Sequence, residues 1–507
     1  METFDYIVIG AGMGGLSAAN FLAKHGKKVL VLEKHQIPGG LVTSFARQGV
    51  HYDLGIYGLY DLKKKETIQQ FLVYWGGEWI PTVPCRGEMH AYIEGKPHIF
   101  RPGRLKEDFQ EAFPQQAEEV NRIFQRMERI VTEMFSGTEA PEPPYDLHLL
   151  ELVKFGIHSW RKKPTFMKYG VKDVAKVLDK LTDAEELKSA IYAYCPYPMV
   201  FMAFAYQWGV FGKGEYPLGG MQAIPDAAAA ALSKAGGVLK LREEVTEILV
   251  EGGKAHGVKT ASGQVYYGAV ISNASPQHTL KWMKGEDRAL FSLKKTMEGR
   301  KIFPAICTLF LAVDDTYDFQ QTECITIAGR KAYQMKPEEY TPENVPVVIN
   351  IYPKRDGDIY RPLVALVPLG YHYEDQWRTG PGQERGKAYR ELKKQVEETI
   401  LQRITEHLGE DFRRAVQAHE FSTPITFERY TYSQEGSFMG WSIEEKAYGK
   451  YLRQSTPIKD LHFVGQWVFP GFGVSAVMAS GYYLAKDLLQ NEGIDLKKEF
   501  QQFVENR

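Results

Sequence analysis

The feature that most constrains the fold is a strand, glycine turn, helix and strand within the first 33 residues. Residues 5–9 are rich in β-branched side chains, as is typical of a strand buried on both faces of a parallel sheet. The turn that follows carries glycines at Gly10, Gly12 and Gly15, with the spacing G-x-G-x-x-G. Residues 16–26 then have helical periodicity, and residues 27–33 form a second apolar strand that ends in an acid. This pattern predicts a βαβ unit whose turn binds the phosphates of a dinucleotide.

Each part of this unit has a physical role in such a site. Gly10 permits the sharp turn, Gly12 lets the backbone approach a pyrophosphate, and Gly15 allows the helix to pack closely on the strand. The amino terminus of the helix offers free N–H groups and partial positive charge to phosphate. Glu33 lies within reach of a ribose diol, and its charge disfavours a 2′-phosphate there. The motif alone is weak, but its place between a strand and a helix favours a dinucleotide site over a structural glycine turn.

The residues after the acid indicate which dinucleotide is bound. A Gly-Gly pair, Gly39-Gly40, follows almost at once, and a second glycine-rich stretch runs from Gly49 to Gly55. Nicotinamide-dependent dehydrogenases do not need such a pair. The arrangement is similar to that of the large flavoprotein superfamily, in which this stretch runs along FAD from the adenosine ribose toward the isoalloxazine ring. We therefore expect FAD rather than NAD as the cofactor.

Two later parts of the chain repeat nucleotide-type features. A glycine turn, an alanine-rich helix and several short strands occupy residues 216–273, and a strand, a glycine loop and a small-residue helix occupy residues 461–489. The last helix would direct its positive end at the flavin. We predict an α/β fold with two parts. A Rossmann-like FAD-binding domain is built from three separated segments, 1–75, 214–290 and 456–507. An α+β substrate-binding domain with a mixed or antiparallel sheet comprises 76–213 and 291–455.

Composition narrows the classes of partner. The formal net charge of −1 argues against nucleic-acid binding through bulk charge. The four cysteines, Cys85, Cys195, Cys307 and Cys324, form no C-x-x-C pair, so neither a metal site nor a disulfide framework is expected. The amino end has no secretory pattern. We expect a cytoplasmic protein, with a peripheral position on the inner face of the membrane as a further hypothesis.

Two segments bear on the substrate. No charge occurs in the 24 residues between Lys188 and Lys213, which are rich in Tyr, Phe, Met and Trp. We interpret them as the wall of an apolar cavity, with ordinary core as the second interpretation and a membrane-dipping hairpin as the third. Residues 147–178 combine Trp and Phe with many lysines, which is what a helix lying on anionic lipid needs. A domain helix with a solvated basic face is an equal alternative.

The glycine and strand motifs together resemble the phytoene desaturase, carotenoid isomerase and retinol saturase family of FAD-dependent oxidoreductases. The matching motifs include Pro38-Gly39-Gly40, Gly219-Gly220-Met221 and Pro470-Gly471-Phe472-Gly473-Val474. The resemblance covers the nucleotide domain well and the substrate domain hardly at all. It implies that the cofactor contacts are Gly10, Gly12, Met13, Gly14, Gly15, Glu33, Lys34, Gly39, Gly40, Leu41, Gly55, Ile56, Tyr57, Val245, Asn273, Gly465, Gln466, Gly473 and Val474.

The resemblance also implies roles for some of these residues. Glu33 would hold the adenosine ribose, Val245 would contact adenine through its backbone, and Gly473 and Val474 would face the flavin ring. The chain departs from the family pattern twice. Leu41 stands where desaturases of this type carry Arg, and Gln466 replaces a common carboxylate. The first departure favours an isomerase-like or saturase-like member, and the second resembles retinol saturases.

The resulting functional hypothesis is an enzyme that acts on carbon–carbon double bonds of a long isoprenoid or polyene by hydride exchange with flavin N5. Desaturation, saturation and cis–trans isomerisation all remain open, as do the electron donor or acceptor and the catalytic residues. Two alternatives use the same architecture. One is a flavin amine oxidase, and the other is a non-redox escort protein that binds isoprenoid chains.

Overall fold

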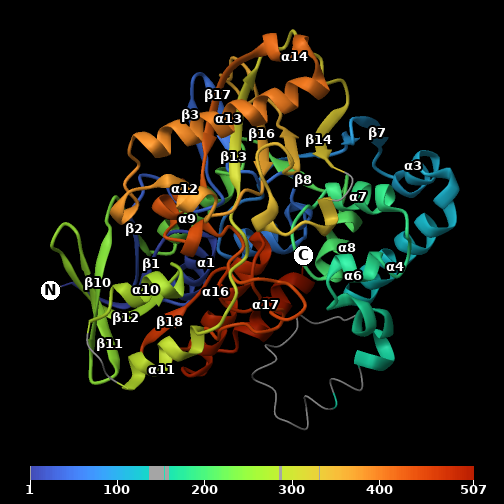
Figure 1. The fold of residues 1–507 in the computed structure, drawn as a ribbon. Helices are drawn as coiled ribbons and strands as arrows, with labels where there is room; N and C mark the ends of the chain where they lie inside the picture. Colours follow the sequence, from blue (N-terminus) through green and yellow to red (C-terminus); the bar gives the residue numbers. More distant parts are fainter. Residues whose placement is uncertain (1, 136–153, 155–158, 285–287, 330–331, 507) are drawn as a thin grey trace.

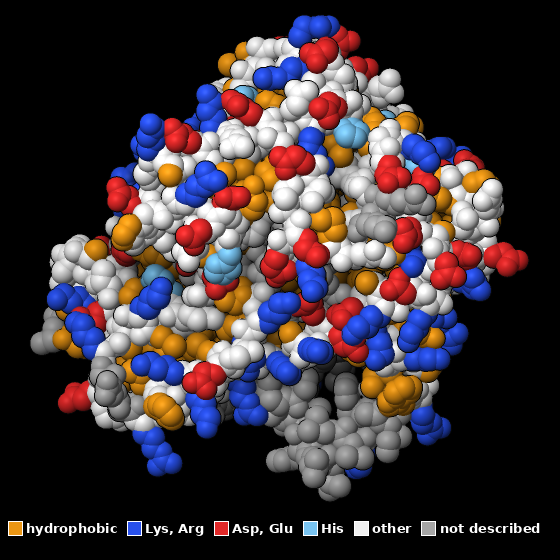
Figure 2. Space-filling model, in the orientation of Figure 1, with side chains coloured by type: hydrophobic (Ala, Val, Ile, Leu, Met, Phe, Trp, Pro, Cys, Tyr) orange, Lys and Arg blue, Asp and Glu red, His pale blue; other side chains and the backbone are white. Residues whose placement is uncertain are grey.

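The computed structural model describes residues 2–135, 154, 159–284, 288–329 and 332–506. It contains two large sheets, each covered by helices, which meet along a central interface (Figure 1). Within the described ranges no helix combines the length and the apolarity that a membrane crossing requires. Acidic and basic side chains are interspersed over most of the face shown in Figure 2.

The first sheet has the strand order β10-β11-β12-β1-β2-β9, and β18 pairs with β12. Its strands are β1 (Glu2–Ile9), β2 (Val29–Glu33), β9 (Val238–Leu241), β10 (Val245–Glu251), β11 (Lys254–Thr260), β12 (Val265–Ser272) and β18 (Leu461–Phe463). The central pairs, β1 with β2 and with β12, are parallel, as is β12 with β18. Strands from the beginning, the middle and the end of the chain therefore share one nucleotide-binding sheet.

Helices α1 (Met13–Lys24) and α16 (Val474–Gln490) pack side by side in this lobe. The Ser17 hydroxyl of α1 donates to the carbonyl of Met478 at 2.6 Å. A Cβ atom on Gly481 would stand 2.5 Å from the backbone nitrogen of Ala18, so only glycine permits this approach. Close contact of the two helices brings their amino termini to the same edge of the sheet.

The second sheet has the order β17-β13-β16-β15-β14-β6-β7. Its strands are β6 (Glu88–Ile93), β7 (Lys96–Phe100), β13 (Cys307–Val313), β14 (Thr322–Ala328), β15 (Val347–Ile351), β16 (Arg361–Val367) and β17 (Val416–Ser422). In this sheet β14 and β6 are parallel, and the other pairs are antiparallel. The prediction of an α/β fold with a second, mixed or antiparallel sheet is confirmed.

Alternate residues of this second sheet face opposite layers. One face packs against α13 (Lys387–Leu408), and the other meets the nucleotide lobe and helices α4 (Ala117–Phe135), α7 (Glu185–Ala193) and α8 (Phe201–Gly209). The remaining elements are β3 (Ser44–Arg47), β4 (Val50–Asp53), α2 (Thr67–Tyr74), β5 (Thr82–Pro84), α3 (Leu105–Ala112), α6 (Val174–Leu178), β8 (Glu215–Pro217), α9 (Ala223–Lys234), α10 (Pro276–Lys281), α11 (Arg288–Met297), α12 (Glu374–Arg378), α14 (Glu410–Ala415), α15 (Pro424–Thr431) and α17 (Leu496–Glu505).

The uncharged segment between Lys188 and Lys213 forms most of α7, all of α8 and the loop that joins them. Most of its large side chains are buried in one cluster with β6, β14 and α4, and Trp208 meets Phe109 edge to face. The segment contributes no lining residue to four of the cavities among the described residues, which other segments line. This packing agrees with ordinary core, the second interpretation, and the cavity wall stays a prediction.

Candidate functional site

The amino terminus of α1 forms a cradle of bare backbone. Gly12 is the N-cap residue, with no side-chain cap and no acid in the first turn. A Cβ on Gly12 would lie 2.5 Å from Nδ2 of Asn273, and one on Gly14 would lie 2.7 Å from the backbone of Gly465. The free N–H groups and the absence of side-chain bulk make this helix end suited to a phosphate group.

Residues from the three nucleotide segments meet at this cradle. The N–H of Gly39 donates to the carbonyl of Ala11 at 2.9 Å, which brings the Gly-Gly pair alongside the first turn. From the end of the chain, the N–H of Val464 donates to the Ser272 carbonyl at 3.0 Å. The N–H of Gly465 donates to Ser480 Oγ at 2.7 Å. Asn273, which follows Ser272, therefore stands between the first and the third segment.

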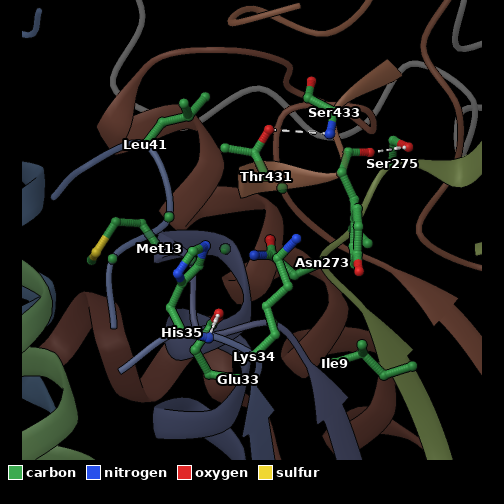
Figure 3. A pocket seen from close by; sticks show the side chains of 18 of the residues that line it. Ile9, Met13, Glu33, Lys34, His35, Leu41, Asn273, Ser275, Thr431 and Ser433 are labelled. Atoms are coloured by element: carbon green, nitrogen blue, oxygen red, sulfur yellow. Dashed lines mark hydrogen bonds between the residues drawn. The ribbon is translucent and has the colours of Figure 1, made fainter. Parts of the chain in front are cut away.

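A cavity opens from this cradle toward the end of β2, and Figure 3 shows Met13, His35 and Asn273 around it. Thirteen of the residues expected to bind the cofactor line it: Gly10, Gly12, Met13, Gly14, Glu33, Lys34, Gly39, Gly40, Leu41, Val245, Asn273, Gly465 and Gln466. Gly15 instead packs beneath the turn, where a Cβ would meet the Gly10 carbonyl at 2.3 Å. The structure thus places the adenosine and pyrophosphate candidates around one cavity.

Glu33 is buried at the end of β2, and both of its carboxylate oxygens already accept hydrogen bonds. Ala11 N donates to Oε2 at 2.8 Å, and His35 N donates to Oε1 at 2.8 Å. A carboxylate has about four acceptor sites, so it can also take ribose hydroxyls. Glu33 therefore fixes the glycine turn to the second strand as well as presenting charge to a ribose.

Sequence reasoning missed the residues that cover the adenosine end of the cavity. Tyr432 lies between Lys34, whose Nζ is 3.1 Å from the ring centroid, and His278, whose ring is stacked at 3.8 Å. Burial lowers the pKa of Lys34 to about 8 and that of His278 to about 4. The Tyr432 hydroxyl donates to Glu244. Neighbouring lining residues, at the end of α15 and just after it, are Tyr430, Thr431 and Ser433, of which Figure 3 labels the last two.

These covering residues come from the segment 291–455 that the sequence assigned to the substrate domain. No glycine spacing or periodicity marks residues 430–433, so a local pattern could not have found them. The contacts of Tyr432 with Lys34 and Glu244 join that segment to the nucleotide lobe.

The other predicted cofactor residues lie toward the interface with the second sheet. Three of them, Gly55, Ile56 and Tyr57, are half-buried. Burial raises the pKa of the Tyr57 hydroxyl well above its usual value, and the neighbouring Cys85 and Glu323 raise it further. Gly473 is the exposed N-cap of α16, with no side-chain cap, and Val474 is the first residue of that helix. This end has the bare helix terminus that suits negative charge on a flavin ring.

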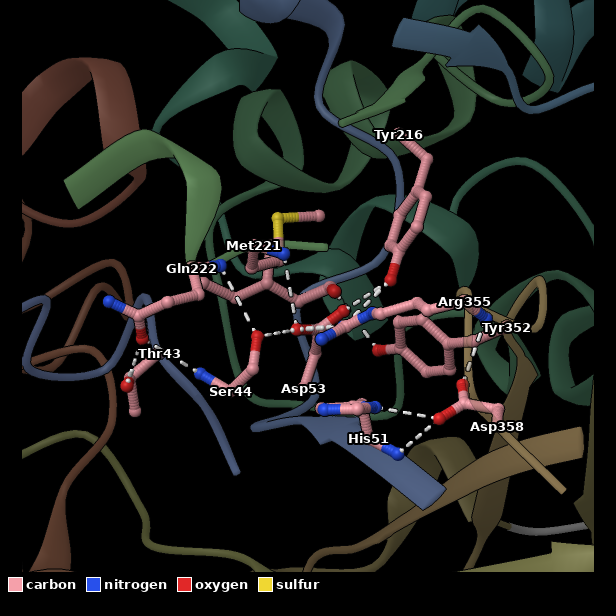
Figure 4. Close-up of polar contacts among 11 residues, drawn as sticks. Thr43, Ser44, His51, Asp53, Tyr216, Met221, Gln222, Tyr352, Arg355 and Asp358 are labelled. Carbon is pink, nitrogen blue, oxygen red and sulfur yellow. Dashed lines mark hydrogen bonds and ion pairs between the residues drawn. The ribbon is translucent and has the colours of Figure 1, made fainter. Parts of the chain in front are cut away.

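A buried polar network ties this region together (Figure 4). Asp53 accepts hydrogen bonds from Tyr216 Oη at 2.6 Å and from Met221 N at 3.1 Å, and it also accepts from Ser44 Oγ. Arg355, from the loop after β15, forms an ion pair with the same carboxylate. The network joins the first and second nucleotide segments to the second sheet just before Gly55.

The described residues fit FAD. A glycine cradle at a helix terminus suits a pyrophosphate, a buried acid at the end of β2 suits an adenosine ribose, and a second bare helix terminus suits a flavin ring. The prediction that residues from three separated segments surround one nucleotide cavity agrees with the hydrogen bonds between them.

Comparison with known proteins gives the same assignment. Residues 13–489 match the family described as flavin containing amine oxidoreductase. A prolycopene isomerase, "Prolycopene isomerase 1, chloroplastic" of an Oncidium hybrid cultivar, is 27% identical over 98% of this chain and 85% of its own length. All-trans-retinol 13,14-reductase of Rattus norvegicus is 25% identical over 92% of this chain and 83% of its own length. The predicted resemblance to carotenoid isomerases and retinol saturases is therefore confirmed.

Solved structures support the fold. Putrescine oxidase, in a structure described as wild type bound to putrescine, superposes with a TM-score of 0.62 at 16% identity, covering 96% of this chain and 99% of that chain. FAD is the cofactor that the family match and the cavity indicate. The chain belongs to the family of flavin-containing amine oxidoreductases and is an FAD-dependent oxidoreductase related to carotenoid isomerases and retinol reductases.

Proposed function

We propose that this enzyme acts on carbon–carbon double bonds of a long, apolar isoprenoid or polyene. The observation that carries the proposal is the face of the second sheet that borders the flavin-ring residues. That face is built mainly of apolar side chains, and Leu366 of β16 is half-buried in the middle of it, against Gly55. The relatives named for prolycopene and retinol support the same class of substrate.

Bound FAD supplies hydride exchange at N5 with an allylic or conjugated carbon. The protein's contribution is to position the chain and to exclude water. At about 0.8 kcal/mol for each buried CH₂, a twenty-carbon chain contributes roughly 15 kcal/mol of transfer free energy, against about 1 kcal/mol for one hydrogen bond. Apolar burial therefore dominates affinity, and polar groups are left to set orientation.

The residues at the ring end suit this role. The amino terminus of α16, at Gly473, would direct partial positive charge toward a flavin ring held there. Ser475, the second residue of the helix, donates a hydrogen bond to Asp61. Burial raises the pKa of the Asp61 carboxyl. The ion pair of Asp53 with Arg355 fixes the stretch that leads to Gly55 and Tyr57.

We also propose that the enzyme is cytoplasmic and collects its substrate at the inner membrane face. The predicted docking segment is 147–178, of which residues 147–153 and 155–158 lie outside the described residues. Among the others, Trp160 is 54% exposed, and Arg161 and Lys162 beside it are exposed. Figure 2 shows hydrophobic side chains bordered by basic ones at the lower right, over the corresponding helical segment of Figure 1.

Two lysines further along the segment are paired within the protein. Lys172 and Lys176 bind Glu445 at 3.0 and 2.7 Å.

Flotation with anionic vesicles tests the docking proposal. Replacing Trp160 by Ala together with Arg161 and Lys162 by Glu should abolish flotation, whereas Lys172→Gln serves as the matched control. Equal flotation of all the proteins would contradict it.

The substrate proposal is tested by anaerobic incubation of the FAD-loaded enzyme with phytoene, poly-cis lycopene and retinol, with and without a reductant, read by chromatography. At least one polyene should change. A Gly12→Val variant, whose side chain would collide with Asn273 in the cradle, is the cofactor-deficient control. If no polyene reacts while a simple amine bleaches the flavin, amine oxidation replaces this proposal. Protein purified without a flavin absorption band, yet binding polyenes, would indicate an escort protein.

A further inference from the structure

A second cavity adjoins the adenosine end of the FAD site. Its volume is about 810 Å³, and it is lined by the end of β2, by α10, by the loop before α13 and by α15. Cavities of this size are typical of small-molecule sites. Both cavities are lined by Lys34, His35, Glu244, Tyr430 and Tyr432, of which Figure 3 labels the first two. None of the residues expected at the flavin ring lines the second cavity, so a ligand there would take no part in hydride exchange.

The lining of this cavity carries an excess of positive charge. Four of its side chains are basic and two are acidic, which gives a formal charge of +2 with both histidines neutral. Both acids already accept hydrogen bonds from within the protein. Glu244 accepts from the Tyr432 hydroxyl. Glu428 accepts from Gln383 Nε2 at 2.7 Å. The acids are therefore engaged with the protein's own groups.

Three of the basic side chains are not engaged in this way. Within the described ranges, no ion pair or hydrogen bond holds the charged groups of Lys281, Arg385 and Arg429. Lys34 differs, because its Nζ donates to the Arg429 carbonyl at 3.0 Å. Burial, together with the positive charges of Lys281 and Lys34, lowers the pKa of His278 to about 4. Unpaired cations around one cavity favour a ligand with several negative charges, and guanidinium groups bind phosphate through two parallel hydrogen bonds.

The lining also offers a flat aromatic surface. Tyr430 is 53% exposed, and its ring is stacked on that of His35, with centroids 5.4 Å apart and planes inclined by 22°. His35 is held in turn, because its Nε2 donates to the Tyr430 carbonyl at 2.8 Å. The Tyr430 ring thus has a fixed neighbour and an exposed part that a planar group can stack on.

We propose that this cavity is a second nucleotide site, which takes a nucleoside polyphosphate in addition to FAD. The phosphates bind Lys281, Arg385 and Arg429, and the base stacks on Tyr430. Arg429 and Tyr430 both line the cavity from the last turn of α15, so one ligand meets charge and ring together. The inference goes beyond the proposed function and does not depend on the identity of the polyene.

The test is calorimetric titration of the FAD-loaded, full-length enzyme, in excess FAD, with ATP and with inorganic tripolyphosphate. Both probes carry the same phosphate chain, and only ATP carries a base. The wild type should bind ATP at least about 5-fold more tightly than tripolyphosphate, the lower limit expected of one stacked base. Tyr430→Ser should lower the affinity for ATP to that for tripolyphosphate and leave tripolyphosphate binding unchanged.

Charge recognition is tested by the double variant Arg385→Gln, Arg429→Gln, which should bind both probes about 10-fold or more weakly. Lys387→Gln with Lys394→Gln is the matched control, because it removes the same charge from exposed ion pairs of α13 outside the cavity. The control should bind ATP within about 2-fold of the wild type. Flavin absorbance of each variant checks that FAD is still bound.

Four results would overturn the inference, and each leaves the proposed function intact. The first is a wild type that holds FAD but binds no ATP. The second is equal binding of ATP and tripolyphosphate by the wild type. The third is an equal loss of affinity in the two double variants, which would indicate unspecific attraction. The fourth is release of FAD by ATP, which would place ATP in the FAD cavity instead.

Discussion

The buried ion pair between Asp53 and Arg355 gives the sharpest prediction about stability. The side chain of Asp53 is 0% exposed and that of Arg355 is 10% exposed. Arg355→Met removes the cation and leaves the carboxylate in the interface between the two sheets. Breaking such a pair from one side costs about 3–5 kcal/mol. Because the hydrogen bonds from Ser44, Tyr216 and Met221 to Asp53 remain, we expect a value near the lower end, about 3 kcal/mol.

The assay is urea unfolding of the FAD-free protein, followed by tryptophan fluorescence. Asp53→Leu is the second arm of a double-mutant cycle, and it leaves Arg355 buried without its partner. Asp53→Leu with Arg355→Met removes both charges together. The double variant should therefore lose at least about 2 kcal/mol less than the sum of the two single losses.

Strictly additive losses would refute this reasoning, because they would show that the two charges do not interact. A loss below about 1 kcal/mol for Arg355→Met would also refute it, since that is the range of an exposed pair. Arg378→Met is the matched control. Arg378 forms an exposed pair with Glu374, so its replacement should change the free energy of unfolding little.

Three further predictions concern the nucleotide site. Glu33→Arg should lower the affinity for FAD more than about 10-fold, whereas Glu33→Gln should lower it less. The bound FAD is measured by flavin absorbance at about 450 nm after gel filtration. Full occupancy by FAD in Glu33→Arg would exclude the assignment of Glu33 to the ribose. Gly481→Val should lower the melting temperature and the FAD content together, because its Cβ meets the backbone of α1 at 2.5 Å; an unchanged melting temperature would mean that α1 and α16 are not in close contact. Burial lowers the pKa of His278 to about 4, below its unfolded value of about 6.5, so the wild type should lose stability as the pH falls from about 6.5 toward 4. His278→Phe should lose less over that window in thermal melts, and parallel curves would contradict the sign.

The sequence predicted the parts of the site that depend on local backbone constraints. The spacing of Gly10, Gly12 and Gly15 between a strand and a helix requires a particular turn, and a turn is a local property of the chain. The Gly-Gly pair at Gly39 and the loop that ends at Gly473 carry the same kind of information. Residues around all of these turns could therefore be assigned to one nucleotide from the sequence.

The parts that could not be predicted depend on contacts between distant segments. Tyr432 reaches the adenosine end because the residue after α15 meets Lys34 and Glu244, and nothing in its local sequence marks that place. The register of β13, β16, β15 and β14 likewise depends on pairing between distant segments, which no periodicity within one strand reveals. Composition alone also could not distinguish a cavity wall from a packed core in the aromatic segment around Trp208.

The central claim is that one FAD is held jointly by the beginning, the middle and the end of the chain. A crystal structure of the protein grown with FAD measures this directly. The account predicts continuous density for one FAD, with adenosine between Glu33 and Tyr432, pyrophosphate at Gly12 and the ring near Gly473. Density that leaves any of these three places empty, or a flavin bound elsewhere, would contradict it.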